Sequence, residues 1–479
     1  MNVHVSQSSA LGNLTLTEAA DAVARGEVSS VELTRSALSA IAARDKIVNS
    51  FIWLDEEQAL STAAALDAMQ RAGRRLGPLH GVPLAHKDMY YRAGKLSTCG
   101  SKIRADFRPT YTATVIERLE GAGSISIGGL NMAEFAQNAT GHNAHYGNCG
   151  NPWNAAYCPG GSSSGSGAAV GARLVYAALG SDTGGSIRLP ASLCGVTGIK
   201  GTQTRVSRYG VMPLSFSADN VGPLARSARD CARIMSAIAG HDARDPTSST
   251  EPVPDYEAAL TGDIRGMTIG VPTNYFLDGV DPEVLKAFQT AQETLKELGA
   301  IIVPVTVPNM DAIATYGSVL SRVEGATIHA QWMRERPQDY AIHLSARLYA
   351  GYGIPATAYL EALARRGELL KAVADDVFSK VTAFICPTIR MKVPTLKQAD
   401  VDAGTEGAVE YFNNLSVNTR PMNYLGVPSV SLPCGLDQDG LPIGLQIQGR
   451  PFSEGTILKI ADAFQCSTDH HRKLPPMLA

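Results

Sequence analysis

The stretch 159–167 reads PGGSSSGSG, and the fold and chemistry of the chain are best inferred outward from it. A second glycine- and serine-rich run, GSDTGGSIR, follows at 180–188. Glycine-rich backbone presents N–H groups that can hold an anion, above all where a helix begins. A single cluster of this kind is ordinarily a set of turns. Two clusters so close together favour a binding or catalytic loop.

Three kinds of loop fit these residues: a phosphate cradle, plain turns and a serine nucleophile. A P-loop ends in Gly-Lys-Ser/Thr, which is absent here, and a dinucleotide fingerprint would lack its preceding strand. In the third case Ser186 is a nucleophile, and neighbouring backbone N–H groups hold a developing oxyanion. No histidine lies in a triad motif, and there is no GxSxG elbow. Lys87 follows the apolar run 82–85 with one residue between, where burial would keep its amine neutral and basic. An ion pair with Asp88 or another acid is the structural role open to Lys87.

The composition excludes several classes of protein. Of the 479 residues, 44% are hydrophobic and 18% are charged, which is typical of a globular chain with a large core. The net charge is −3, so neither nucleic acid nor an anionic membrane is expected as a partner. Eight scattered cysteines without a CxxC pair predict free thiols in a reducing, cytoplasmic compartment. Residues 1–5 show no signal-peptide start, and 168–179 is too short to span a membrane.

Periodicity and capping residues predict alternating helices and strands. Ser29 and Glu32 form a capping-box pattern, just after Gly26 ends an earlier helix. A strand at 267–272, a helix at 281–298 and a strand at 301–305 form a β-α-β unit, which favours parallel pairing. Further strands are expected at 81–88, 124–128, 385–387 and in a hairpin of 429–433 with 444–447. Further helices are expected within 14–45 and at 56–73, 114–120, 168–179, 226–239 and most of 310–380. Loops are expected at 136–166 and 180–201, and a linker at 242–262.

Three motifs in a fixed order make the chain recognisable. They are GVPLAHKD at 81–88, GGSSSGS at 160–166 and DTGGSIRLP at 182–190. Together they resemble the amidase signature family. The resemblance continues through GVTGIK at 195–200, VGPL at 221–224 and GVP at 426–428, and covers nearly the whole chain. Gly201 and the segment 128–131 depart from the usual family pattern, outside the three motifs.

The resemblance implies a Ser–Ser–Lys triad. Ser186 is then the nucleophile, Ser162 the bridging serine that follows a cis peptide bond, and Lys87 the terminal base. Ser163 and Ser164 could also bridge, although capping the loop suits them better. Asp182 and Arg188 are expected to brace the loop. The residues assigned to the oxyanion hole or to backbone contact with substrate are Thr183, Gly184, Gly185 and Ala136.

The implied fold is α/β: a large layered α/β/α domain with a central mixed, mostly parallel sheet and helices on both faces. We expect one domain, 1–479, with N-terminal helices (1–75), a catalytic motif core (76–241), a variable helical pocket region (242–400) and a C-terminal return to the sheet (401–479). No cofactor or metal is implied. A zinc site is the competing hypothesis for the loop before the first cluster, but its spacing matches no common site. Its candidate ligands are His142, His145, Cys149 and Cys158.

The implied activity is hydrolysis of a carboxamide or a related C–N acyl bond through an acyl-enzyme. We expect a small-molecule substrate, an apolar or aryl amide or a carbamate, because four residues suggest an apolar pocket: Trp332, Tyr411, Phe412 and Leu415. The glutamine-hydrolysing subunits of tRNA-dependent amidotransferases are similar in layout and are the alternative. They carry an acid where Ser416 stands here, three residues before a Thr-x-Pro segment. A non-catalytic assembly subunit is a further alternative, opposed by the intact triad. Homodimers are common among similar proteins.

Overall fold

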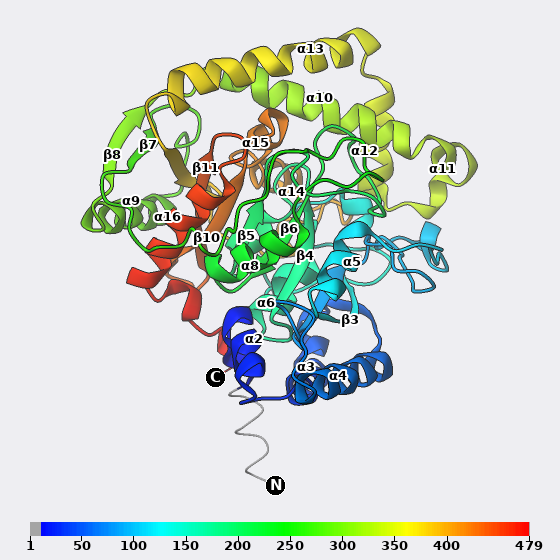
Figure 1. The fold of residues 1–479 in the computed structure, drawn as a ribbon. Helices are drawn as coiled ribbons and strands as arrows, with labels where there is room; N and C mark the ends of the chain where they lie inside the picture. Colours follow the sequence, from blue (N-terminus) through cyan, green and yellow to red (C-terminus); the bar gives the residue numbers. More distant parts are fainter. Residues whose placement is uncertain (1–10, 479) are drawn as a thin grey trace.

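The computed structural model describes residues 11–478, and a single β-sheet runs through its interior (Figure 1). The strands are, in chain order, β1 (Phe51–Leu54), β2 (Pro83–Lys87), β3 (Ile125–Leu130), β4 (Ala177–Asp182), β5 (Thr197–Lys200), β6 (Asn220–Ala225), β7 (Thr268–Pro272), β8 (Ile301–Val305), β9 (Ala383–Pro387), β10 (Ser429–Leu436) and β11 (Pro442–Gly449). Their order across the sheet is β1-β3-β2-β4-β6-β5-β10-β11-β9-β7-β8. The expectation about a signal peptide falls on residues 1–5, outside the described residues.

The sheet is mixed. Parallel pairs occur in two blocks, β3-β2-β4 and β9-β7-β8, and the second contains the predicted β-α-β unit. The pairings between these blocks and at the β1 edge are antiparallel. Antiparallel pairing is thus more extensive than the β-α-β pattern indicates. One reason is that β10 and β11 form the predicted hairpin, which needs only a tight turn.

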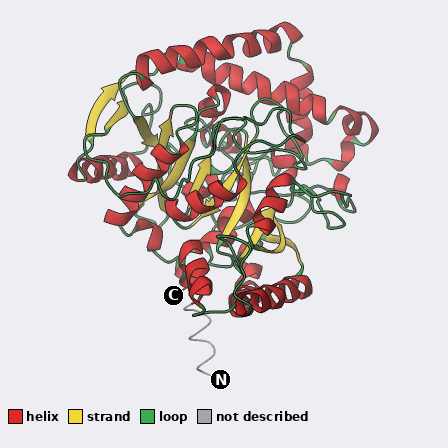
Figure 2. Ribbon diagram, in the orientation of Figure 1, coloured by secondary structure: helices red, strands yellow, loops and turns green. Residues whose placement is uncertain are grey.

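Helices cover both faces of the sheet (Figure 2). They are α2 (Leu16–Arg25), α3 (Ser30–Val48), α4 (Glu56–Arg71), α5 (Thr114–Gly121), α6 (Ser164–Gly171), α7 (Arg188–Leu193), α8 (Ala228–Ile238), α9 (Pro282–Glu297), α10 (Met310–Ile328), α11 (Ala330–Glu335), α12 (Ile342–Tyr352), α13 (Ala356–Val373), α14 (Ala408–Asn414), α15 (Arg420–Leu425) and α16 (Glu454–Ser467). The α/β class with helices on both faces is confirmed.

Side chains of successive strand residues enter different cores. On β2, Leu84 packs into a core with α2, α5, α8 and α16, whereas Ala85 packs into one with α3, α4 and α6. Leu179 and Ala178 of β4 divide in the same way. Because neighbouring side chains point to opposite faces, a strand buried on both sides must be apolar throughout. This burial explains the continuous apolar run that predicted β2.

The N-terminal helices end as their sequence predicts. Ser29 and Glu32 exchange side-chain and backbone hydrogen bonds in a capping box, and Gly26 ends α2 at φ 73°. At the opposite end of the molecule, α10 and α13 pack together above the sheet (Figure 1). Their apolar residues form a third core with Phe384 of β9. The predicted helical character of 310–380 is therefore confirmed.

The predicted helix at 168–179 is wrong. The helix is α6, which ends at Gly171, and the chain turns at Arg173 with φ 57° before entering β4. Small apolar residues such as Ala177 and Ala178 fit a buried strand as well as a helix, so composition could not separate the two. The predicted loop at 180–201 likewise contains α7 and β5.

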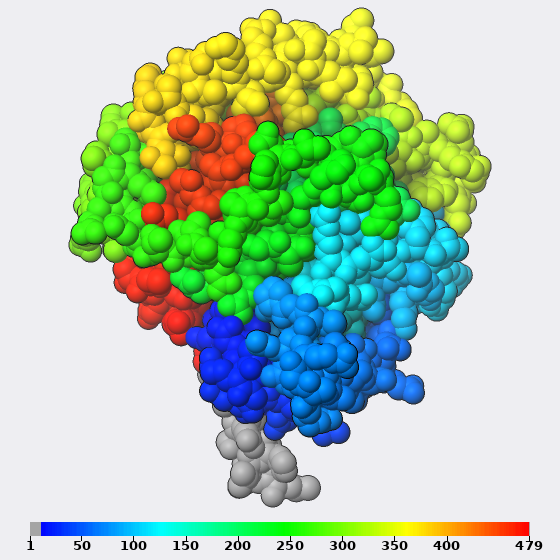
Figure 3. All heavy atoms as spheres, in the orientation of Figure 1, coloured from blue at the N-terminus to red at the C-terminus, as the bar shows by residue number. Residues whose placement is uncertain are grey.

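The polar segment 242–262 forms neither helix nor strand, but it is packed against the rest of the chain. The Arg205 guanidinium donates to the carbonyls of Glu251 and Pro252, at 2.8 and 2.6 Å. In the space-filling view the green part of the chain, which includes this segment, lies across the front face (Figure 3). The segment is therefore a surface strap rather than a free linker.

Two predictions about the cysteines and the membrane can be compared with the structure. All eight cysteines are free thiols, and every one except Cys466 is buried. Among the described residues, no helix combines the length and the apolar character needed to cross a bilayer.

The glycine-rich stretch should not tolerate side chains where backbones meet. A Cβ on Gly165 would lie 2.4 Å from the Ser50 carbonyl oxygen and 2.6 Å from Asn131 backbone atoms. We expect Gly165→Ala to lower the free energy of unfolding by about 1–3 kcal/mol, since backbone atoms cannot move aside. The exposed Gly367 of α13 has open space around it, so Gly367→Ala should raise stability by about 0.5–1 kcal/mol. Urea denaturation measures both variants, and an unchanged midpoint for Gly165→Ala would contradict this account.

Candidate active site

Lys87 lies at the centre of the site, at the end of β2. Its Nζ donates to Ser162 Oγ at 2.7 Å and to Ser181 Oγ at 2.9 Å. β2 pairs in parallel with β4, and this pairing brings Ser181 alongside Lys87. Lys87 is only 1% exposed and Ser162 is fully buried. The fold thus encloses an amine among hydroxyl groups, and no carboxylate of residues 11–478 forms an ion pair with it.

Burial controls the charge of Lys87. Removal from water lowers the pKa of its amine to about 7, against the opposing charges of Asp219 and Asp182. Near neutral pH a large fraction of this amine is therefore unprotonated. An uncharged lysine has a lone pair and can accept a proton from a hydroxyl at the observed 2.7 Å separation.

Ser162 is held at the start of the glycine-rich stretch. The Gly161–Ser162 peptide bond is cis, as the family resemblance implied. The Ser162 carbonyl accepts from the Ala133 N–H at 3.1 Å, and the Ser163 N–H donates to the Ser186 carbonyl at 3.3 Å. This last bond joins the two glycine- and serine-rich loops. The side chain of Ser163 exchanges hydrogen bonds with the Ser181 backbone, which is a structural role.

Asp182 and Arg188 fix the loop that holds Ser186. The Asp182 carboxylate accepts two hydrogen bonds from the Arg188 guanidinium, both 2.9 Å, and both side chains are completely buried. Although burial opposes ionisation, the charge and hydrogen bonds of Arg188 hold the pKa of Asp182 well below its usual range. The same guanidinium donates to Gln446 of β11 and Asn423 of α15, each at 2.6 Å. The loop is therefore tied to the far half of the sheet.

The backbone donors around Ser186 are not equivalent. The Gly185 N–H donates to Asp182 Oδ1 at 2.8 Å, so it braces the loop. Within residues 11–478, the N–H groups of Thr183, Gly184 and Ser186 have no hydrogen-bond partner. The Thr183 hydroxyl donates to Asp219 at 2.5 Å. Of the three N–H groups predicted for the oxyanion, those of Thr183 and Gly184 are thus free to hold one.

Ser186 opens onto a cavity of about 60 Å³. Ala136 lines it from a short turn in which Phe135 and Ala136 have φ values of 46° and 63°. The lining residues are Ala136, Gln137, Asn138, Ala139, Thr183, Gly184, Ser186, Leu189, Leu214, Ser321, Arg347, Phe412, Ser416 and Arg420. The region 242–400 contributes to this wall through Ser321 of α10 and Arg347 of α12.

The wall of this cavity is less apolar than predicted. Phe412 lines it, but Leu415 is buried in a separate core and Tyr411 faces another cavity. Trp332 stacks on Phe135, with ring centroids 5.4 Å apart. Sequence reasoning missed the contributions of Arg347 and Arg420, because no motif marks them and they belong to different helices, α12 and α15.

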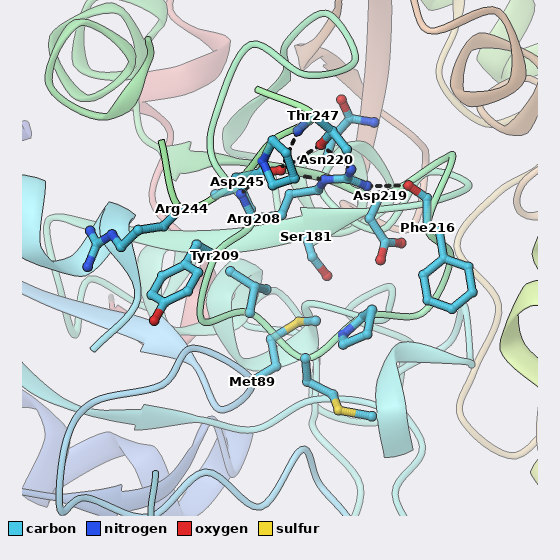
Figure 4. Close-up of a pocket in the computed structure, with 15 residues that line it drawn as sticks. Met89, Ser181, Arg208, Tyr209, Phe216, Asp219, Asn220, Arg244, Asp245 and Thr247 are labelled. Carbon is cyan, nitrogen blue, oxygen red and sulfur yellow. Dashed lines mark hydrogen bonds and ion pairs between the residues drawn. The ribbon is translucent and has the colours of Figure 1, made fainter. Parts of the chain in front are cut away.

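A second cavity, of about 290 Å³, is separate from the Ser186 cavity and is shown in Figure 4. It reaches Ser181 and Asp219, and Ser186 is not part of its lining. At its rim Arg208 donates to the Phe216 carbonyl and to the Thr247 hydroxyl, both at 2.6 Å. The contact of Ser181 with Lys87 was not predicted from the sequence either, because the segment that contains Ser181 was expected to be a loop.

The zinc hypothesis finds no support in the positions of its four residues. His145 bonds to Glu134 at 2.9 Å, and His142 bonds to the Thr140 hydroxyl at 2.7 Å. Cys149 and Cys158 contact different backbone carbonyls. In the described part of the chain, no group of three or more His, Cys, Asp and Glu side chains could hold a metal ion.

Comparison with known proteins places the chain in a family. The family model described as Amidase matches residues 32–458. The A subunit of glutamyl-tRNA(Gln) amidotransferase from Chloroflexus aggregans is 42% identical over 486 residues, covering 97% of this chain and 98% of that protein. A chain of a solved complex, described as a vestigial protein complex that reveals the evolutionary origins of an s-triazine catabolic enzyme, has a TM-score of 0.88 to this chain. The two chains are 34% identical, and the match covers 95% of this chain and 98% of the other. Peptide amidase from Stenotrophomonas maltophilia has a TM-score of 0.82 at 31% identity, covering 96% and 98%.

The chain belongs to the amidase family, the amidase signature family that its motifs resemble. It is an amidohydrolase that acts on C–N bonds.

The Asp182–Arg188 pair should dominate the stability of the site. Arg188→Met would leave the Asp182 carboxylate buried without its cation, which costs about 3–5 kcal/mol in comparable buried pairs. We expect a correspondingly lower denaturation midpoint in urea. The matched control is Arg265→Met, which removes an exposed partner of Asp263 and should leave the midpoint unchanged. Equal midpoints for Arg188→Met and the wild type would show that the pair does not hold the loop.

Proposed function

We propose that the chain hydrolyses a small amide through an acyl-enzyme on Ser186, with Ser162 as the proton bridge and Lys87 as the base. The observation that carries the proposal is the 2.7 Å contact between a buried Lys87 amine and Ser162. A serine hydroxyl needs a base to become a nucleophile. The Lys87 amine, in direct contact with Ser162, can be neutral near pH 7 and so can serve as that base.

The reaction proceeds in two halves. Lys87 takes the proton of Ser162 while Ser162 takes that of Ser186, and the Ser186 oxygen bonds to the amide carbon. The free N–H groups of Thr183 and Gly184 hold the oxyanion. The C–N bond then breaks as Ser162 returns a proton to the leaving nitrogen, which departs as an amine or ammonia. Water repeats the sequence on the ester, giving a carboxylic acid and restoring Ser186.

A second candidate is the glutamine-hydrolysing subunit of a tRNA-dependent amidotransferase, which would act with partner chains. The 42% identity to the Chloroflexus aggregans protein, over almost the full length of both chains, favours it. The cavity favours it less, because Ser416 stands where the resemblance places an acid for the glutamine amino group. Turnover of glutamine in preference to related amides would support this candidate over a free-standing amidase.

Removing the Ser186 hydroxyl should abolish turnover. For Ser186→Ala we expect kcat/KM on small amides and p-nitroanilides to fall by about 10⁴-fold or more, as when other serine nucleophiles are removed. A sulfonyl fluoride should label the wild-type peptide that contains Ser186, as detected by mass spectrometry, and should leave that peptide unlabelled in the variant.

The matched control is Ser166→Ala. Ser166 is also buried and belongs to the stretch 159–167, but its hydroxyl donates to the Leu179 carbonyl at 3.0 Å. This variant should keep wild-type kcat/KM within a few-fold. Full activity in Ser186→Ala, or a label on another serine, would refute the assignment of the nucleophile.

The pH profile should report the charge of Lys87. The protonated amine is inactive and the neutral amine is the base, so kcat/KM should rise with pH, about tenfold per unit below about pH 7, and then level off. Lys87→Arg should be inactive at every pH, because a guanidinium stays protonated.

Lys200 provides the control for this titration. Burial lowers its pKa to about 7 as well, but its Nζ donates to the Gly201 carbonyl rather than to a serine. Lys200→Met should therefore keep the midpoint of the kcat/KM profile, with circular dichroism confirming the fold. A profile that loses this midpoint in Lys200→Met would exclude Lys87 as its origin.

A further inference from the structure

Three arginines cluster at the Ser186 cavity without a counter-ion. Arg347 of α12 and Arg420 of α15 line the cavity. Arg322 of α10 lies close enough for its charge to lower the pKa of both. Among the residues that the structure describes, no carboxylate forms an ion pair with any of the three, and the cavity lining contains no acidic residue. A half-buried group of like charges is unfavourable unless something neutralises it.

The pKa values of Arg347 and Arg420 reflect this electrostatic cost. Burial, together with the charges of Arg420 and Arg322, lowers the pKa of Arg347 to about 9. Burial and the charge of Arg322 also lower the pKa of Arg420. An anion inside the cavity would offset both effects.

Several hydrogen-bond donors at the wall of the Ser186 cavity have no partner among the described residues. Arg347 Nε donates to Gln137 Oε1 at 3.0 Å, and Arg420 Nη2 donates to the Ser416 hydroxyl. Within the described residues, the other N–H groups of these two guanidiniums have no partner. The buried Nε2 of Gln137 also has none. Guanidinium groups present paired N–H donors in a plane, a geometry that matches the two oxygens of a carboxylate.

The cluster lies next to the reacting centre. A Cβ placed on Gly184 would be 3.7 Å from Arg420 Cγ and 4.0 Å from its Nε. Gly184 is one of the free backbone donors beside Ser186. A carboxylate held by Arg420 would therefore be separated from the acyl carbon by a short chain, which suits the small cavity.

We propose that the substrate is a small amide that carries a carboxylate and no ammonium group, with the carboxylate held by Arg347 and Arg420. This inference rests on the Ser186 chemistry proposed above and adds the class of substrate. Water would convert the monoamide of a short dicarboxylic acid into the dicarboxylate and ammonium. A substrate ammonium is disfavoured because it would meet guanidiniums and no carboxylate.

Three amides of one chain length test the proposal. Pentanamide is neutral, glutaramate replaces its terminal methyl with a carboxylate, and glutamine adds an ammonium to glutaramate. We expect kcat/KM for glutaramate to exceed that for pentanamide by about 10- to 100-fold, the range of a charge-assisted hydrogen-bond pair. Glutaramate should also exceed glutamine. Equal values for pentanamide and glutaramate would overturn the carboxylate site, and a preference for glutamine would overturn the exclusion of ammonium.

Variants assign the effect to the arginines. Arg420→Gln and Arg347→Gln should each lower the ratio of glutaramate to pentanamide turnover by about tenfold or more. The control Arg365→Gln removes an exposed arginine of α13, which pairs with Glu368, and should leave the ratio unchanged. Ser416→Asp places a carboxylate against Arg420 and should shift the preference from glutaramate toward glutamine by about tenfold. Unchanged ratios in both arginine variants would refute the proposal.

Binding separates this inference from the catalytic proposal. Calorimetry with Ser186→Ala should detect glutaramate binding, and the double variant Ser186→Ala/Arg420→Gln should bind it at least about tenfold more weakly. If no amide is turned over but this difference is found, the Ser186 chemistry fails and the carboxylate site stands. If Ser186-dependent turnover is found but glutaramate binds both variants equally, the carboxylate site fails and the chemistry stands.

Discussion

A lysine amine enclosed by a sheet is the constraint on which the site depends. Lys87 ends β2 beside β4, and two serine hydroxyls replace the water that an ammonium would retain. Hydroxyls compensate a full charge poorly, so the amine loses its proton readily. This effect requires that β2 be covered on both faces, by the cores that contain Leu84 and Ala85. The layered fold is thus what allows this lysine to lose its proton near neutral pH.

Two buried basic side chains at the site, Arg188 and Lys87, have different kinds of partner. Arg188 is completely buried and is matched by a bidentate carboxylate, Asp182, with further acceptors on β11 and α15. This set of partners holds the loop in place. Lys87 donates instead to two hydroxyls, and its pKa falls to about 7. The choice of partner, rather than burial itself, therefore distinguishes the side chain that braces the loop from the amine whose pKa is lowered.

The sequence predicted the elements that local pattern controls. The capping box at Ser29, the apolar run before Lys87 and the β-α-β unit from β7 to β8 were all found in the structure. It did not predict β4, since small apolar residues are compatible with either a helix or a strand, and only the pairing with β2 and β6 selects the strand. The contact of Ser181 with Lys87 was missed for the same reason. A serine expected in a loop gives no reason to place it beside the end of β2.

The pocket wall was beyond prediction for a different reason. The motifs that identify the family lie in β2, β4 and the two glycine-rich loops, so they specify the reaction. Part of the wall of the Ser186 cavity comes from α10, α12 and α15, where Arg347 and Arg420 lie in ordinary helical sequence. Only the folded chain brings both side chains to the Ser186 cavity, with Arg420 beside Gly184, and leaves them without a counter-ion among the described residues. Identity of 42% to an amidotransferase component therefore says more about the sheet and its motifs than about the cavity wall, because a wall residue such as Arg347 can change while the sheet and its motifs stay the same.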